Sequence, residues 1–347
     1  MSDRHSFQLS KELQQALEAS RPKGRSSGVR GIVEENDQIV EQEGFRLADG
    51  RWQAVPKPGP AEVVEAEAES EPPAAFSMFN FPVTKVCVAN VDTLTAALFL
   101  KEAAALNFAN AETPGGRYRC GAMAQEEDLC RLLPQLYHSL LNSGAYPIKP
   151  GTALITRNLL AVRRPGSYEL VEKLGECCIL TAAMPCGMAD RRPKRGWLGE
   201  NSPWAATAAL RIRASLTAAK ATGCPNLVLG AFGCGAFGNP PGPVAAIFRQ
   251  QLVLPEFRGC FQNVVFAIID PMGTGNLRPF REEIAKLDLS VVTAKAESKT
   301  GSAATDKSGS MLQEQVVDAP SLLPTNSGRK DKESQATDES ATEEKKK

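Results

Sequence analysis

Two adjacent carboxylates, Glu126 and Glu127, follow a loop that contains the glycine pair Gly115 and Gly116. An apolar run at 105–109 precedes the loop, so the order is strand, glycine loop and helix start. Glycine reaches positive φ and lets the backbone approach a ligand closely, which suits a loop that wraps a sugar or phosphate. A pair of carboxyl groups beside such a loop could supply acid–base chemistry.

Plain helix-start chemistry is the alternative interpretation of the two glutamates. Asp and Glu are common in the first turn of a helix because the helix dipole stabilises negative charge there. Spacing alone therefore does not establish a catalytic pair.

A second glycine-rich stretch, GCGAFG at 233–238, lies between an apolar strand predicted at 226–231 and a helix predicted at 244–252. Successive backbone N–H groups in such a turn form a concave anion site near a helix N-terminus. We expect this loop to bind a diphosphate. A glycine turn that only reverses the chain is the alternative.

Taken together, the two stretches resemble the microbial-type poly(ADP-ribose) glycohydrolases of the macrodomain superfamily. The resemblance rests on Gly115-Gly116, a spacer and Gln125-Glu126-Glu127, and on the GCGAFGNPP wording of the second loop. Residues 108–110, 121–122 and 129–131 also fit that branch. The family usually has three consecutive glycines, and the third position here is Arg117, which could offer phosphate a planar fork of donors.

The resemblance implies a role for each matching residue. Glu127 would protonate the oxygen that leaves the bond between adjacent ADP-ribose units and would then activate water, and Glu126 would orient ribose hydroxyls. Gln125 and Asn110 would hydrogen-bond the terminal ribose region, and Phe237 would pack against that ribose. The remaining implied substrate-binding residues are Gly115, Gly116, Gly233, Cys234, Gly235, Ala236 and Gly238.

Glu127 faces two opposing influences on its pKa. A helix start lowers a carboxyl pKa, whereas a general acid needs it raised. Burial by substrate, the neighbouring Glu126 and the incoming diphosphate act upward, so we expect the acid form mainly in the complex. One carboxyl beside a substrate phosphate could then suffice, with no metal and no cofactor.

Alternating apolar runs and helical patterns predict an α/β domain: a mixed sheet between helices, as in macrodomains, with a small N-terminal helix–hairpin extension. Helical spacing precedes Asp49-Gly50, which lies between two extended runs and predicts the hairpin. We expect a flexible tail at 1–28, the helix and hairpin at 29–55, a linker at 56–78, the catalytic domain at 79–287 and a disordered tail at 288–347.

Composition bounds the partners. The 40 basic and 40 acidic residues balance, so no global field predicts nucleic-acid or membrane binding. Nine cysteines without CxxC spacing favour reduced thiols in an intracellular protein, cytoplasmic or nuclear. The expected partners are poly(ADP-ribose) or ADP-ribosylated proteins, the expected state is a monomer, and the resemblance implies a role in the DNA damage response.

Two other functions compete with glycoside hydrolysis. A macrodomain that binds ADP-ribose without cleaving it would not need both carboxylates. A nucleotide-binding dehydrogenase would need GxGxxG after the first strand of a βαβ unit, and no such motif follows the first strand predicted in the domain, at 83–89.

Overall fold

The structure is a computed structural model that describes residues 5–22, 29, 31–66, 80–186, 202–270 and 275–287. The tail predicted at 288–347 lies outside the described residues. One mixed sheet dominates, in the order β1-β5-β10-β9-β6-β8-β7-β4. Its strands are β1 Ser6–Leu9, β4 Glu62–Glu65, β5 Val83–Ala89, β6 Ala103–Phe108, β7 Thr152–Arg163, β8 Leu170–Ala182, β9 Asn226–Leu229 and β10 Asn263–Ala267. Pairing is parallel from β1 to β8, and antiparallel between β8 and β7 and between β7 and β4.

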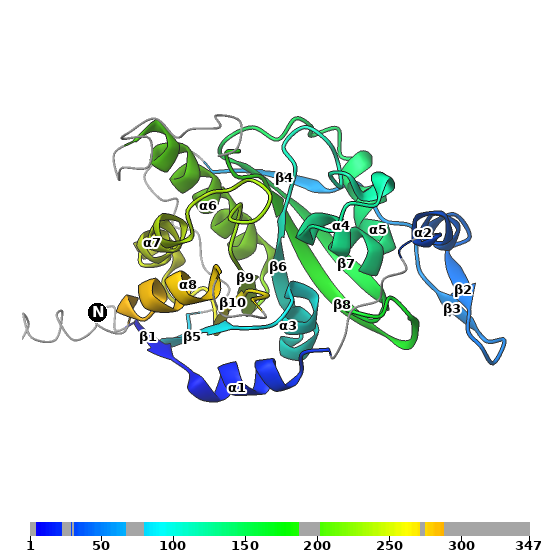
Figure 1. Cartoon of the computed structure of the whole chain (residues 1–347), viewed down its shortest axis with the longest axis horizontal. Coiled ribbons are helices and arrows are strands. Elements are labelled where there is room, and N and C mark those ends of the chain that lie inside the picture. The colour runs from blue at the N-terminus through cyan, green and yellow to red at the C-terminus, as the bar shows by residue number, and fades with distance from the viewer. Residues whose placement is uncertain are drawn as a thin grey trace, which may run out of the picture. The chain divides into compact units, whose positions relative to one another are not determined.

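Helices cover both faces of this sheet (Figure 1). Successive residues of a strand point to opposite faces, so neighbours such as Val86 and Cys87 belong to different cores. One core is covered by α6 Pro203–Thr222, α7 Pro241–Leu252 and α8 Leu277–Ile284. The other is covered by α1 Lys11–Ala19, α3 Thr93–Leu100, α4 Gln125–Leu132 and α5 Pro134–Leu141. The predicted mixed sheet between helices is confirmed.

Local sequence sets where the longest helix, α6, begins and ends. Ser202 accepts a hydrogen bond from the backbone N–H of Ala205, and Pro203 occupies the first helical position. Gly223 ends the helix in the left-handed conformation at φ 72°. The apolar face that includes Trp204 and Ile212 is buried against the sheet, as its spacing predicts.

Residues 5–22, part of the flexible tail predicted at 1–28, form a strand and a helix, and the rest of that tail lies outside the described residues. Strand β1 pairs in parallel with β5 and extends the sheet, with Phe7 opposite Thr84. Helix α1 is capped by Ser10, and Leu17 is fully buried in the same core as Leu94. The helix is short, but the tertiary contact of one apolar face orders it.

The segment predicted as a linker at 56–78 also contains sheet structure. Strand β4, Glu62–Glu65, pairs antiparallel with β7, and Ala61 is buried. The strand reads Glu-Val-Val-Glu, without the alternation of apolar and polar residues that would predict it, and its surroundings are rich in Pro, Glu and Ala. The rest of that segment, from 67 to 78, lies outside the described residues.

The predicted helix and hairpin at 29–55 are present as α2 Ile32–Glu41, β2 Gly44–Arg46 and β3 Trp52–Ala54. Buried Asn36 joins this unit to the domain, because its Nδ2 donates to Tyr118 Oη at 3.2 Å and to the carbonyl of Arg131 at 2.9 Å. Its Oδ1 accepts from Arg163 Nε at 2.9 Å. A buried polar network thus joins this unit to the domain that contains the large sheet.

The parallel strands bring several loops to one place. The carboxyl ends of β5, β6, β9 and β10 lie at the same edge of the sheet, and the residues that follow each strand meet there. Ligands of open α/β sheets bind outside these ends. In the described part of the chain, no helix has the length and apolar character to cross a membrane.

Leu17 tests whether the N-terminal segment belongs to the core. We expect Leu17→Ala to lower the free energy of unfolding by about 2–5 kcal/mol, because it leaves a cavity under α1. Gln15→Ala, at an exposed position of the same helix, is the matched control and should change it by less than about 0.5 kcal/mol. Urea unfolding measures both. Equally small changes in the free energy of unfolding for both variants would show that the segment does not pack in the core.

Candidate active site

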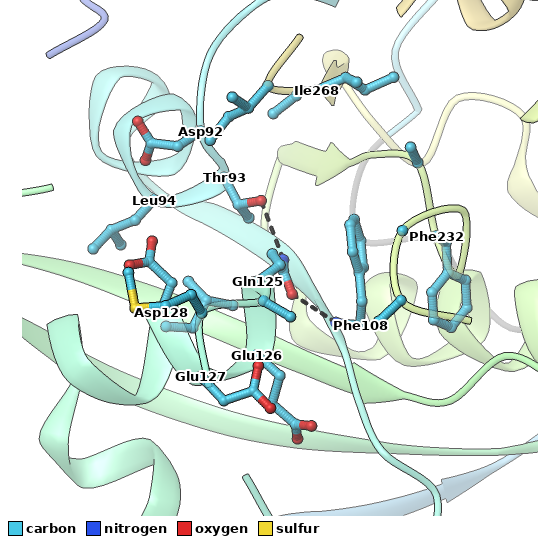
Figure 2. Close-up of a pocket in the computed structure, with 18 of the residues that line it drawn as sticks. Asp92, Thr93, Leu94, Phe108, Gln125, Glu126, Glu127, Asp128, Phe232 and Ile268 are labelled. Carbon is cyan, nitrogen blue, oxygen red and sulfur yellow. Dashed lines mark hydrogen bonds between the residues drawn. The ribbon is translucent and has the colours of Figure 1, made fainter. Parts of the chain in front are cut away.

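A cavity of about 440 Å³ opens at the carboxyl ends of the parallel strands. Its walls come mainly from the residues after β5, β6, β9 and β10 and from the first turn of α4, with further residues such as Arg21 and Tyr168 from other parts of the chain. Figure 2 shows Glu126 and Glu127 at one end of the pocket, with Asp92 and Ile268 at the other. Phe108 and Phe232 form an aromatic wall between them, with ring centroids 5.6 Å apart.

Two backbone amides hold the carboxylates. Glu127 Oε1 accepts from the N–H of Arg117 at 2.9 Å. Glu126 Oε2 accepts from the N–H of Asn110 at 2.7 Å, and its Oε1 accepts from Asn107 Nδ2 at 3.4 Å. Each carboxylate therefore has a fixed direction, which a catalytic group requires.

Both carboxylates are buried, with 3% of Glu126 and 7% of Glu127 exposed. Burial, with repulsion from Glu127 as a smaller cause, raises the pKa of Glu126 to about 8, against hydrogen bonds from Asn110 and Asn107 that lower it. The raised pKa favours the protonated form of Glu126 near neutral pH. Glu127 Oε2 is buried and has no hydrogen-bond partner among the described residues.

The glycine pair does not line the pocket, but it allows the loop backbone to approach the carboxyl groups closely. Gly115 and Gly116 have φ of 67° and 58°. A Cβ on Gly116 would lie 2.6 Å from Glu127 Oε1 and 2.8 Å from Glu126 Oε2, and one on Gly115 would meet the Tyr137 ring at 2.7 Å. The loop backbone therefore approaches the two carboxyl groups closely at this pair, and the contact of Gly115 and Gly116 with a ligand stays a prediction.

The third position of the glycine run is Arg117, and its backbone conformation does not require glycine. Its φ of −104° and ψ of 30° suit a side chain, and its N–H is the donor to Glu127. A short 3-10 turn, Tyr118–Cys120, follows it directly. The Arg117 side chain is exposed and does not line the cavity, so a phosphate contact through its guanidinium is not indicated.

Gln125 lines the pocket, but its side-chain amide is used within the protein. Its Oε1 accepts from the Phe108 N–H at 2.8 Å, and its Nε2 donates to Thr93 Oγ1 at 3.1 Å (Figure 2). The Nε2 also donates to the Leu106 carbonyl at 2.7 Å. Both Nε2 hydrogens are thereby taken. Through these bonds Gln125 ties α4 to β6 and α3, and its hydrogen bond to ribose stays a prediction.

Asn110 lines the pocket and also organises the loop after it. Its Oδ1 accepts from the N–H groups of Glu112 and Thr113 at 2.8 and 3.0 Å. Its own N–H is the donor to Glu126. The Nδ2 is the part of this side chain that can serve a ligand.

The second glycine loop forms the wall opposite the carboxylates. Gly233, Gly235, Ala236 and Phe237 line the cavity, as predicted. Cys234 and Gly238 do not, because their N–H groups close turns on the carbonyls of Ala231 and Gly235, at 3.0 Å each. A Cβ on Gly233, at φ 72°, would lie 2.6 Å from Met184 Cβ, so close packing of two loops explains that glycine.

Several residues of the pocket were missed by sequence reasoning. They are Arg21, Asp92, Thr93, Phe232, Ile268, Ile269 and Asn276. Asp92 caps α3 by accepting from the Thr95 N–H at 2.8 Å, which the sequence does predict, but its place in the cavity depends on the sheet order. The position after each parallel strand is the signal that could have found Asp92 and Ile268.

No group of three or more His, Cys, Asp or Glu side chains is arranged to hold a metal ion among the residues that the structure places. All nine cysteines are free thiols, five of them buried.

Comparison with known proteins is consistent with this geometry. A family model described as "Microbial-type PARG, catalytic domain" matches residues 33–152, which include the glycine pair and both glutamates. A search of curated proteins finds no match.

Solved structures extend the match over most of the domain. Poly(ADP-ribose) glycohydrolase from Thermomonospora curvata is 27% identical over 73% of this chain and 98% of its own, with a TM-score of 0.58. The same enzyme bound to the inhibitor ADP-HPD is 28% identical over the same shares, with a TM-score of 0.59. The Deinococcus radiodurans enzyme in complex with ADP-ribose is 32% identical over 61% of this chain and 87% of its own, with a TM-score of 0.53. From the paired glutamates, the glycine loops and these matches, we conclude that the chain belongs to the microbial-type poly(ADP-ribose) glycohydrolase family.

Proposed function

We propose that this protein hydrolyses the ribose–ribose O-glycosidic bonds of poly(ADP-ribose) and releases ADP-ribose. The observation that carries the proposal is the buried pair Glu126 and Glu127, each fixed by a backbone amide, across one pocket from a glycine-rich loop. Glycoside cleavage needs a carboxyl group on the leaving oxygen and negative charge near an oxocarbenium-like transition state.

In the proposed pose, one ADP-ribose unit lies along the pocket in a single direction. Gly235, Ala236 and Phe237 would meet the diphosphate through backbone N–H groups, as glycine turns do for anions. The ribose with the scissile bond would then lie between Phe237 and the carboxylates, and Asn110 Nδ2 would reach its hydroxyls. The adenosine half would extend toward Asp92 and Ile268, at the other end of the pocket (Figure 2).

In the proposed mechanism, Glu127 donates a proton to the 2′ oxygen of the neighbouring unit as the bond to the anomeric carbon breaks. Positive charge then develops on the ribose, and the substrate diphosphate stabilises it. Glu127, now a carboxylate, takes a proton from water, which attacks the anomeric carbon and completes hydrolysis. Glu126, protonated near neutral pH, donates a hydrogen bond to a ribose hydroxyl without adding a second negative charge beside Glu127.

A module that binds ADP-ribose without cleaving it is the alternative function. Burying two adjacent carboxyl groups costs free energy, because each loses its hydration. A module that only binds ADP-ribose does not need two buried carboxyl groups. Incubation of the purified protein with poly(ADP-ribose), with free ADP-ribose as the readout, decides between the two, since a reader would release none.

The wider setting follows from the same proposal. We propose a macrodomain-type fold and an intracellular protein, which the free thiols support because extracellular proteins tend to pair them. The partners would be poly(ADP-ribose) and ADP-ribosylated proteins, with the protein acting as a monomer and without nucleic acid. A role in the DNA damage response rests on the family resemblance.

Glu127→Gln tests the acid. We expect turnover of poly(ADP-ribose) to fall by about 10²–10⁴, because the amide cannot transfer the proton. Affinity for ADP-ribose should stay within a few-fold, since shape and polarity are retained. Glu112→Gln, at an exposed position of the preceding loop, is the control and should leave turnover unchanged. Wild-type turnover in Glu127→Gln would remove Glu127 from this role.

Glu126 gives a pH-dependent stability. The unfolded chain ionises this group near pH 4.5, whereas the folded protein keeps its proton to about pH 8. The free energy of unfolding should therefore decrease as pH rises through this window, by up to about 1.4 kcal/mol per pH unit from this group. Glu126→Gln should remove that part of the slope, and Glu41→Gln on the surface of α2 should not. Urea unfolding at pH 5, 6.5 and 8 measures it, and identical slopes in wild type and Glu126→Gln would contradict the assignment.

Gly235 tests the diphosphate loop. A Cβ at this position would have no heavy atom within 4 Å, and φ lies outside the left-handed region. A side chain here therefore strains neither the packing nor the backbone. Gly235→Val should therefore leave the melting temperature unchanged while its methyl groups obstruct the ligand, weakening ADP-ribose binding by at least about tenfold. Gly242→Val is the control, because its Cβ is equally unobstructed but lies outside the pocket lining. Unchanged calorimetric affinity in Gly235→Val would place the diphosphate elsewhere.

A further inference from the structure

The N-terminal segment contributes to the pocket as well as to the sheet. Arg21 and Pro22 line the cavity, directly after α1. The catalytic-domain family model begins at residue 33, so these two residues lie outside the matched range. A segment that composition marks as a tail therefore reaches the substrate site.

The position of Arg21 is set by several contacts of the preceding segment. Leu17 is fully buried, and Glu18 pairs with Arg281 on α8 at 2.7 Å and accepts from the Asn90 N–H at 3.0 Å. Arg21 Nη1 donates to Asn90 Oδ1 at 3.0 Å. Asn90 in turn exchanges two hydrogen bonds with the backbone of Asp270, so the guanidinium is tied to the ends of β5 and β10.

The charges of the pocket make Arg21 distinctive. Among the described side chains that line the cavity, four are carboxyl groups, Asp92, Glu126, Glu127 and Asp128, and Arg21 is the one cation. The diphosphate of a bound ADP-ribose adds negative charge to this carboxyl-rich pocket. A half-buried guanidinium at the rim would offset part of that repulsion and would also present a flat face and unused donors.

The contact with Asn90 places Arg21 at one particular end of the pocket. Asn90 lies two residues before Asp92, and its partner Asp270 follows Ile269, so Arg21 belongs to the end opposite the catalytic glutamates. Under the proposed function, which this inference rests on, that end receives the adenosine half of the bound unit. We propose that Arg21 is a substrate-binding residue that contacts this adenosine half, and that the N-terminal segment is thereby part of the active site.

Arg21→Ala tests the contact by calorimetry with ADP-ribose and with ADP, which share the adenosine half. We expect both ligands to bind about tenfold more weakly, as when a charge-assisted contact is lost. KM for poly(ADP-ribose) should rise by a similar factor while kcat stays within about twofold, because Arg21 is far from the proton transfer. The melting temperature shows whether the variant is folded.

Two control variants separate a contact from indirect effects. Lys11→Ala removes one positive charge from the exposed face of α1, and Arg278→Ala removes one from the exposed face of α8, outside the contacts that position Arg21. Both should keep wild-type affinity. The inference is overturned if Arg21→Ala binds ADP-ribose within twofold of wild type, or if either control loses as much affinity as Arg21→Ala. The wild-type protein in the same experiments reports on the proposed function separately, through its own binding and cleavage.

Discussion

The structure of the site depends on how two adjacent carboxyl groups are held inside the protein. Each loses water on burial, which costs several kcal/mol unless other donors replace it. The N–H groups of Asn110 and Arg117 are those donors, and both belong to the loop between β6 and α4. The loop must therefore fold tightly over the first turn of α4, and Gly116 is the residue that allows its backbone to come so close.

That requirement extends outward through α4. Gln125, immediately before the pair, hydrogen-bonds through its side-chain amide to the backbone of β6 and to Thr93. These bonds fix the start of α4 relative to that strand. At the other end of the helix, Asn36 of α2 accepts from Arg163 and donates to the Arg131 carbonyl and to Tyr118. The helix–hairpin unit thus fixes both α4 and the loop that supplies Arg117, so it supports the site as well as packing against the domain.

The strand order of the sheet determines which loops lie opposite the two glutamates. Because β5, β6, β9 and β10 run parallel, the loops after them converge, and the second glycine loop arrives across the pocket from α4. The aromatic pair Phe108 and Phe232 closes the space between the two walls. The same edge also collects Arg21, through a hydrogen bond to Asn90 at the end of β5. Chain segments more than two hundred residues apart share one cavity as a result.

The sequence by itself determined the chemistry of the site and most of the elements that carry it. Paired glutamates after a glycine loop, a second glycine loop between strand and helix, and caps such as Ser202 are local patterns, which depend on neighbouring residues and are readable from them. Only the tertiary structure decided the roles of Gln125 and Gly116, the pKa rise at Glu126, and the places of β1, β4 and Arg21. Those depend on burial and on partners distant in the chain, and neither composition nor spacing carries that information.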